Sequence, residues 1–165
     1  MSVIAGEIKF YYTGGSSNQT PGNSLGGTGS TYAVTGGINN LFDNVLASEA
    51  SAGDVEYRAI DIININASSE ALYNAKCWVT VSGLYIGVAL WIDTSGTAVA
   101  SPSNESTPPA GASFAGYASE GTALVLSSEL TYPEKVRLWI RRTINASATA
   151  QTNVGFTLTV QGETT

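Results

Sequence analysis

The feature that most constrains the fold is an alternation of apolar and polar side chains with a period of two, which recurs along the chain. It is clearest from Glu134 to Arg142. The aliphatic residues Val136, Leu138 and Ile140 alternate there with Arg137, Trp139 and Arg141. Because an extended chain points successive side chains to opposite faces, this pattern predicts a strand with one apolar face. Spacing of three or four residues, which a helix requires, is almost absent.

Other segments rich in β-branched and aromatic residues, separated by Gly, Ser, Asn and Pro, predict further strands. They are Glu7–Thr13, Val55–Ile65, Ala75–Val81, Leu84–Asp93, Thr122–Ser127 and Asn153–Gln161, with shorter candidates at Thr31–Thr35 and Gly96–Ala100. Strands without alternating helices predict an all-β fold, a single-domain antiparallel β-sandwich. A jelly roll is preferred because its strand count of about eight matches, and an immunoglobulin-like sandwich is the rival.

Three segments depart from the strand pattern. Asn40–Ala52 is expected to contain a helical turn, because Leu41, Val45 and Leu46 fall at helical spacing after a capping asparagine. Gly14–Ser30 is expected to be a flexible Gly/Ser loop, and Ser101–Gly111, with three prolines, a second loop. We therefore divide the chain into an N-terminal strand or arm with its loop, 1–30, and the sandwich, 31–165, and expect the arm to pair with a neighbouring subunit.

The chain of 165 residues has no histidine and a single cysteine, Cys77. This composition excludes His-dependent triads, His-ligated zinc and thiolate zinc clusters, and it predicts Cys77 as a small buried hydrophobe. The remaining chemistry is that of paired carboxylates, as in glycosidases. The candidate acids are Asp43, Glu49, Asp54, Glu56, Asp61 and Asp93, and their spacing matches no catalytic motif. We expect no enzymatic activity.

The first four of these acids lie close together in the sequence, and oxygen-rich loops can hold Ca²⁺. A calcium site at Asp43, Glu49, Asp54 and Glu56 is therefore one possibility, with acids at turns as the alternative. Their spacing does not match an EF-hand loop. We expect no resident metal and no cofactor.

Charge and hydropathy limit the partners. Only 12% of residues are charged and the net charge is -6, without a Lys/Arg cluster, so nucleic acid is not an expected partner. A membrane is not expected either, because no stretch reaches the roughly 20 apolar residues of a spanning helix. The first residues lack the basic and apolar regions of a signal peptide, which predicts synthesis in the cytoplasm.

Aromatic residues on strands usually fill a core, but some are placed for contact with partners. Trp139 shares a face with Arg141, which predicts a ring that points away from the core, as an interface anchor or a platform for sugar stacking. The predicted interface residues are Phe10, Tyr11, Tyr12, Trp139, Arg141, Pro108 and Pro109. Trp78, Trp91 and Trp139 are the residues that a carbohydrate-binding module would use.

Four segments carry a resemblance to a known class of protein. They are Asn40-Leu41-Phe42-Asp43-Asn44-Val45 with Glu49, Gly53-Asp54 and Glu56-Tyr57-Arg58 after it; Glu7 to Gly15; Val136 to Thr143 with Trp139 and Arg141-Arg142; and Phe156-Thr157-Leu158-Thr159-Val160. Together they resemble small structural proteins of tailed-bacteriophage virions. Physically the first segment indicates a fold element, in which Arg58 pairs with Glu49 or Glu56.

The resemblance implies a capsid decoration, or cement, protein on the surface of the virion. Such a protein is expected to form a homo-oligomer, with a trimer preferred, and to bind the major capsid protein and stabilise the head. A tail, baseplate or fibre-associated structural protein is the alternative within this class. A carbohydrate-binding module is the alternative from another class.

Overall fold

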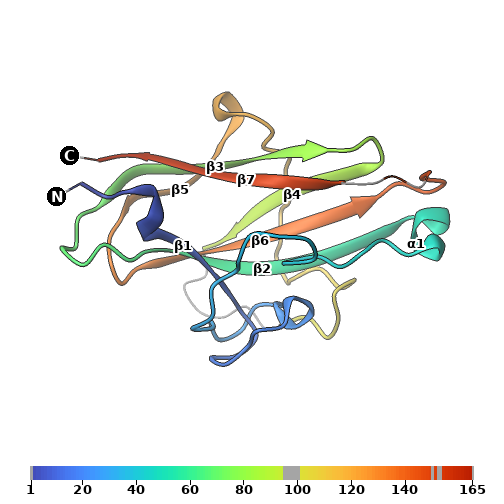
Figure 1. Ribbon diagram of the computed structural model, residues 1–165, viewed down its shortest axis with the longest axis horizontal. Coiled ribbons are helices and arrows are strands. Elements are labelled where there is room, and N and C mark those ends of the chain that lie inside the picture. The colour runs from blue at the N-terminus through green and yellow to red at the C-terminus, as the bar shows by residue number, and fades with distance from the viewer. Residues whose placement is uncertain (1, 95–100, 150, 152–153, 165) are drawn as a thin grey trace.

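The computed structural model describes residues 2–94, 101–149, 151 and 154–164, which form two antiparallel sheets (Figure 1). The larger sheet has the order β1-β2-β6-β4 and the smaller one β5-β3-β7. The strands are β1 (Ile8–Tyr12), β2 (Asp54–Asn64), β3 (Leu72–Ser82), β4 (Ile86–Asp93), β5 (Leu124–Leu130), β6 (Lys135–Ile144) and β7 (Gly155–Glu163). The helical elements are α1 (Ala47–Ala52) and the 3-10 turns Ala5–Glu7, Pro21–Asn23 and Glu120–Thr122. The predicted antiparallel β-sandwich is confirmed.

The strand order does not confirm the preferred jelly roll. The rival, an immunoglobulin constant-type sandwich, would place the first, second, fifth and fourth strands in one sheet. Here the sixth strand, β6, takes the place of the fifth, beside β2 and β4. Seven predicted strands correspond to the seven observed ones. Thr31–Thr35 makes only an isolated bridge, between Ala33 and Tyr11, and Gly96–Ala100 lies outside the described residues.

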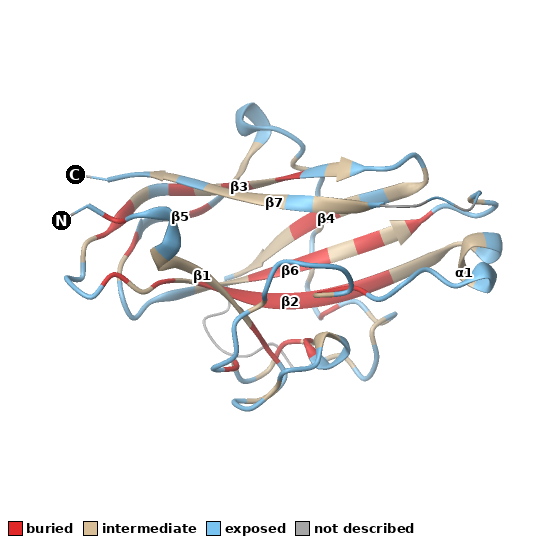
Figure 2. Cartoon of the chain, in the orientation of Figure 1, coloured by how far each residue is buried: buried red, intermediate tan, exposed pale blue. Residues whose placement is uncertain are grey.

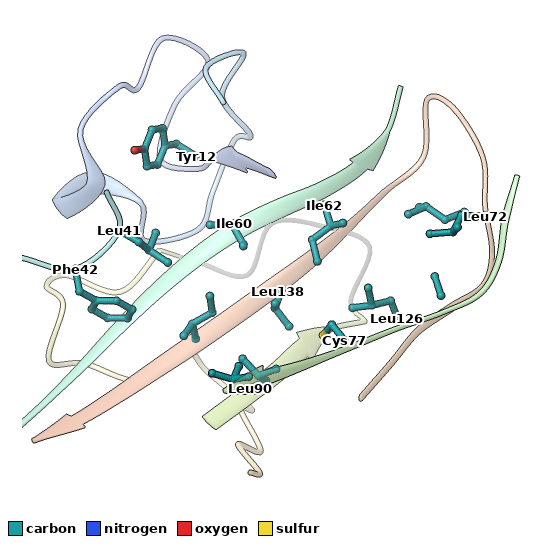
Figure 3. Packing of buried hydrophobic residues seen from close by; sticks show 14 residues of the cluster. Tyr12, Leu41, Phe42, Ile60, Ile62, Leu72, Cys77, Leu90, Leu126 and Leu138 are labelled. Atoms are coloured by element: carbon teal, nitrogen blue, oxygen red, sulfur yellow. The ribbon is translucent and has the colours of Figure 1, made fainter. Parts of the chain in front are cut away.

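The main core lies between the two sheets and follows the alternation of the sequence. Ile60 and Ile62 of β2 and Leu138 of β6 point toward Cys77 of β3 and Leu126 of β5 (Figure 3). Each of these residues is buried, and Cys77 is fully buried, as predicted. Burying an aliphatic side chain contributes roughly 1.5–3 kcal/mol, so this layer is the main source of stability. Buried residues run along β2 and β6 in the centre of the larger sheet (Figure 2).

A second, smaller cluster lies on the outer face of the larger sheet. Tyr57, Ala59 and Trp139 form it, and Trp139 is fully buried. The ring points away from the main core as predicted, but the expectation of an exposed interface ring is wrong. The 14–30 loop folds over it: a Cβ added at Gly26 would lie 2.7 Å from Trp139 Cζ2, so only a glycine allows this approach.

The first 30 residues belong to the same sandwich as the rest. β1 pairs with β2 of its own chain, from Ile8 opposite Asn64 to Tyr12 opposite Ile60. The loop after it was expected to be flexible, but buried hydroxyls hold it to the sheet. Ser24 Oγ donates a hydrogen bond to the carbonyl of Ala59 (2.6 Å), and the backbone N–H of Thr13 donates to Ser24 Oγ (2.9 Å). Backbone and hydroxyl bonds replace the apolar burial that the loop lacks.

The predicted helical turn is shorter than expected. α1 covers only 47–52, and its first turn is capped by Glu49, whose carboxylate accepts a hydrogen bond from the N–H of Leu46 (2.7 Å). Leu41 and Phe42 do not belong to a helix, and they are buried in the main core. No described helix has the length and hydropathy to cross a membrane.

Candidate functional site: an apolar groove beside a strand edge

The helix α1 lies at one end of the sandwich (Figure 1). Residues at that end, including Leu46 and Ala47, line a groove with a cavity volume of about 1230 Å³. One wall is the 36–47 segment and the other is the beginning of β7, 155–158. Ile60, Ile140 and Ile144 of the larger sheet also line it. The volume exceeds the roughly 300–1,000 Å³ of a typical small-molecule pocket, which suits a segment of protein better than a small ligand.

Large apolar side chains are exposed on both walls. On the 36–47 wall Ile38 is 88% exposed and Leu46 is 59% exposed, and on the other wall Val154 is 39% exposed. Phe156 and Leu158 of β7 are half-buried, pack on the main core and also line the groove. Grouped exposed residues of this kind mark a surface that binds another molecule, whereas single exposed aliphatic residues do not.

Arg142 of β6 lies at the floor of the groove and joins two carboxylates. Its Nε donates to Glu56 (2.6 Å), and its Nη1 donates to the backbone carbonyl of Asp43 (2.7 Å). Its Nη2 is within 3.2 Å of the Asp43 carboxylate and also contacts Glu56. Glu56 and Arg142 are directly opposite each other in the β2–β6 register. The charges that line the groove are therefore compensated within the chain.

A second guanidinium completes this buried cluster. Arg58 Nη2 pairs with the carboxylate of Glu105, lies 3.7 Å from Glu56, and its Nε donates to the carbonyl of Leu41 (3.2 Å). The Phe42 ring lies 5.3 Å from the guanidinium carbon of Arg58 and 4.8 Å from that of Arg142. The cluster ties the loop at Leu41 and Phe42 to the larger sheet. The predicted pairing of Arg58 with Glu56 is confirmed.

Burial raises the pKa of the Glu56 carboxyl above its ordinary value, Arg142 and Arg58 lower it, and Asp43 adds to the rise. A carboxyl with a raised pKa beside a groove is typical of a general acid. Here, however, Glu56 is bound by both arginines and is not among the residues that line the groove. Its geometry is that of a structural ion pair.

The outer edge of β7 runs beside this groove. Residues 155–160 are in unbroken register with β3 on one side, and no described strand pairs with the other side. The other edges of the sheets differ. Backbone bonds from the 30–34 segment cover the edge of β1, a bridge to Ala115 covers part of β4, and a bulge interrupts β5. β7 is thus the most accessible regular edge in the described part of the chain.

Comparison with known proteins leaves the groove to be interpreted from its own residues. No family model, curated protein or solved structure matches the chain. The groove presents apolar side chains, internally compensated charges and an unpaired strand edge. These are the means by which a surface binds protein, through apolar contact and backbone pairing.

The structure brings two of the predicted carboxylates together and places Glu49 and Asp61 apart from them. Glu56 and Asp43 share Arg142, whereas Glu49 caps α1. Asp61, on the opposite face of β2 from Glu56, accepts hydrogen bonds from Arg137 Nε (2.7 Å) and Lys135 (3.0 Å). Among the residues that the structure describes, no three Asp, Glu, Cys or His side chains are placed to hold a metal ion. The four acids of the candidate calcium site therefore do not assemble into one.

The predicted interface residues are spread over three regions. Phe10 and Tyr12 of β1 pack in the main core, where the Tyr12 hydroxyl donates to the carbonyl of Asn40 (2.7 Å). Tyr11, between them, is half-buried. Of these three only Phe10 lines the groove.

The other candidates lie outside the groove. Arg141 packs over the Phe114 ring at 5.5 Å and is half-buried. Pro108 is exposed, whereas Pro109 is buried within the chain. Pro109 and Trp139 therefore offer no exposed surface, and the remaining candidates do not form one patch.

The three tryptophans occupy different environments. Trp139 is buried, and Trp91 packs against the same outer cluster as Phe114. Trp78 of β3 is half-buried on the outer face of the smaller sheet, opposite Thr159 of β7. Trp78 is therefore the tryptophan that best retains the predicted role of a sugar-stacking ring.

Sequence reasoning missed the groove residues Ile38, Leu46 and Phe156. It also missed Arg142 as the centre of the ion cluster. The sequence does contain a signal for Arg142. It lies two residues after Ile140 and four after Leu138, so the alternation of a strand places all three side chains on the same, core-facing side. A charged residue at a core position indicates a buried partner. That partner, Glu56, is 86 residues away in sequence, and no local pattern identifies it.

Proposed function

We propose that this chain is a non-enzymatic structural protein of a tailed-phage virion, and most specifically a capsid decoration protein that binds the major capsid protein. The observation that carries the proposal is the apolar groove of about 1230 Å³ beside the unpaired edge of β7. This surface suits contact with protein chains rather than the turnover of a small substrate. The sequence resemblance to small virion proteins supports the assignment to a particle.

The low charge of the chain supports the same function. With 12% charged residues and polar side chains that are mainly Ser, Thr and Asn, the surface carries few of the lysines that disfavour association. A decoration protein is present in many equivalent copies, so a modest interface at each of them, of about 800 Å² per partner, suffices to stabilise a shell.

The test is the position and effect of the chain on the particle. Cryo-electron microscopy of virions that carry it is expected to show its density on the icosahedral shell. Capsids depleted of the chain should rupture at a lower temperature, and adding the purified chain should restore their stability. Density on the tail would replace this proposal with the tail or baseplate alternative, and absence of the chain from the particle would refute both.

Trp78 supports a second candidate function, carbohydrate binding. Its half-buried ring lies on the outer face of the smaller sheet, opposite Thr159, and such a ring can stack on a sugar while threonine hydroxyls contact the sugar's own hydroxyls. Titration with cell-surface polysaccharide, followed by tryptophan fluorescence, tests it. Binding should be lost in Trp78→Ala and kept in Val125→Ala, a change at an exposed apolar residue of β5. If the wild-type chain shows no quenching, this function is excluded for that polysaccharide.

A further inference from the structure

Among the residues that the structure describes, the outer edge of β7 shows none of the devices that usually protect a strand edge. Soluble proteins protect such edges with lysine, proline, bulges or a covering segment. The 155–162 part of β7 contains no charged residue and no proline, and it is in regular register from Gly155 to Val160. An edge of this kind, beside exposed apolar residues, is a template for pairing with another strand.

We propose that two copies of this chain pair edge to edge through β7, antiparallel around a two-fold axis centred on Leu158. The sequence of β7 is self-complementary in this register. Leu158 faces Leu158, Phe156 faces Val160, and Thr157 faces Thr159. Apolar side chains thus meet apolar ones on the inner face, and threonines meet on the outer face, where cross-strand pairs of Thr stabilise a sheet.

The groove favours the same pairing. A strand added to the edge of β7 points its inner side chains in the same direction as Phe156 and Leu158 of the first copy, toward the groove. The second β7 therefore covers the mouth of the groove and the exposed Ile38 and Leu46 on its far wall. Apolar burial would then add to the backbone hydrogen bonds, which is needed because a strand pair alone is marginal in water.

Charge does not oppose the contact, although each chain carries a net charge of -6. The charged residue of β7 is Glu163, at the end of the strand. In the proposed register the two Glu163 residues are ten positions apart along the strands, or about 34 Å. That separation exceeds the screening length of about 8 Å at physiological ionic strength. The paired region itself is neutral.

This inference rests on the virion proposal and narrows it: the protein that occupies the groove and the β7 edge is a second copy of the chain, and contact with the shell uses another surface of the dimer. It also differs from the trimer that the sequence resemblance implies. The oligomeric state is measured on the purified full chain without any particle, so its result is independent of whether the chain is found on a capsid.

Sedimentation velocity over a range of concentrations tests the pairing. The wild-type chain should form a dimer, and Thr157→Lys with Thr159→Lys should raise the dissociation constant about tenfold or more, because like charges would stand opposite each other across the two-fold axis. The matched control is Val125→Lys with Ser128→Lys. It adds the same charge at exposed positions of β5, at the opposite edge of the smaller sheet from β7, and should leave the dimer unchanged.

A cross-link identifies the register. In Thr157→Cys with Thr159→Cys, each new cysteine faces one of the other copy, so oxidation should give a covalent dimer on a non-reducing gel. A wild-type chain that is monomeric at about 1 mM would overturn the proposal, since even a weak pair would form there. A trimer, or a dimer that both lysine variants leave unchanged, would also overturn it.

Discussion

Replacing Arg142 with methionine should strongly destabilise the chain, because it removes the main partner of a buried carboxylate. Methionine keeps the apolar part of the side chain against Phe42, so the loss is mainly electrostatic. The Glu56 side chain is 4% exposed, and only Arg58, at 3.7 Å, would remain near it. Breaking a buried pair from one side costs about 3–5 kcal/mol. The Asp43 carboxylate is 68% exposed and adds little to this cost.

The cost should depend on pH, with a sign that the pKa of Glu56 fixes. Burial raises this pKa in the folded chain, so stability from this group is highest below the unfolded value and declines as pH rises through the folded value. Without Arg142 the folded pKa rises further, because the charge that lowered it is gone. The variant should therefore show its largest loss of stability at neutral pH and recover part of that loss as the pH is lowered, because protonation of Glu56 removes the unpaired buried charge.

Urea denaturation at neutral and at mildly acidic pH measures both effects. For a chain of this size a loss of 3–5 kcal/mol corresponds to a fall in melting temperature of about 6–20 °C. The matched control is Arg142→Met combined with Glu56→Gln, which removes the buried charge and should recover stability at neutral pH. A loss below about 1 kcal/mol would refute this account, because surface ion pairs reach that value. A loss that is equal at both pH values would refute it as well.

Three further changes test other parts of the fold. Gly26→Ala should lower the free energy of unfolding, measured in urea, by about 1–3 kcal/mol, because φ is +85° and the new Cβ would lie 2.7 Å from Trp139 Cζ2. The control is Gly22→Ala, where a new Cβ meets nothing within 4 Å; it should change the free energy of unfolding by no more than about 0.5 kcal/mol. Thr13→Val should cost about 1–3 kcal/mol by the same measurement, because its buried hydroxyl accepts from the N–H of Gly26 (2.9 Å) and a valine leaves that donor unpaired. Burial raises the pKa of the Cys77 thiol to about 12, so a thiol reagent at pH near 8 should leave the native chain unmodified and react after unfolding in urea; rapid native reaction would contradict the burial.

The sequence predicted the strands well because their pattern is local. In β6 the alternation of Leu138 and Ile140 with Arg137 and Trp139 reports directly which side chains share a face. Burial on the second face was not predictable in this way. Trp139 is covered by the loop at Gly26, more than a hundred residues earlier in the chain, through a close approach and hydroxyl bonds that leave no periodic signal. The alternation of residues along a strand indicates on which face of the sheet a side chain lies, but not which segment of the chain covers that face.

The groove was missed for a related reason. Its walls come from the 36–47 segment and from the beginning of β7. The sequence pattern predicts a helical turn within Asn40–Ala52, which overlaps the first wall, and a strand over Asn153–Gln161, which contains the second. Ile38 stands alone in a Gly- and Asn-rich stretch, so no window around it has an apolar pattern. It becomes part of an apolar surface only because β7, over a hundred residues later, faces it across the groove.

The ion cluster and the groove lie at the same end of the sandwich, and the composition of two strands explains why. The core-facing positions of β2 change from Ile60 and Ile62 to Arg58 and Glu56 toward the end that carries α1, and β6 presents Arg142 there. Charged side chains can be buried only where they have partners. At this end the partners come from loops: Phe42, Asp43 and Glu105 contact the two arginines. The side chains of Arg58, Glu56 and Arg142 are only 2%, 4% and 7% exposed, so these loops exclude water from the charges. Phe42 also contacts Phe156 of β7, with ring centroids 5.9 Å apart. At this end a loop segment therefore lies between the charged inner face of the larger sheet and β7, and the groove is formed by that loop and β7 rather than by direct contact of two aliphatic faces.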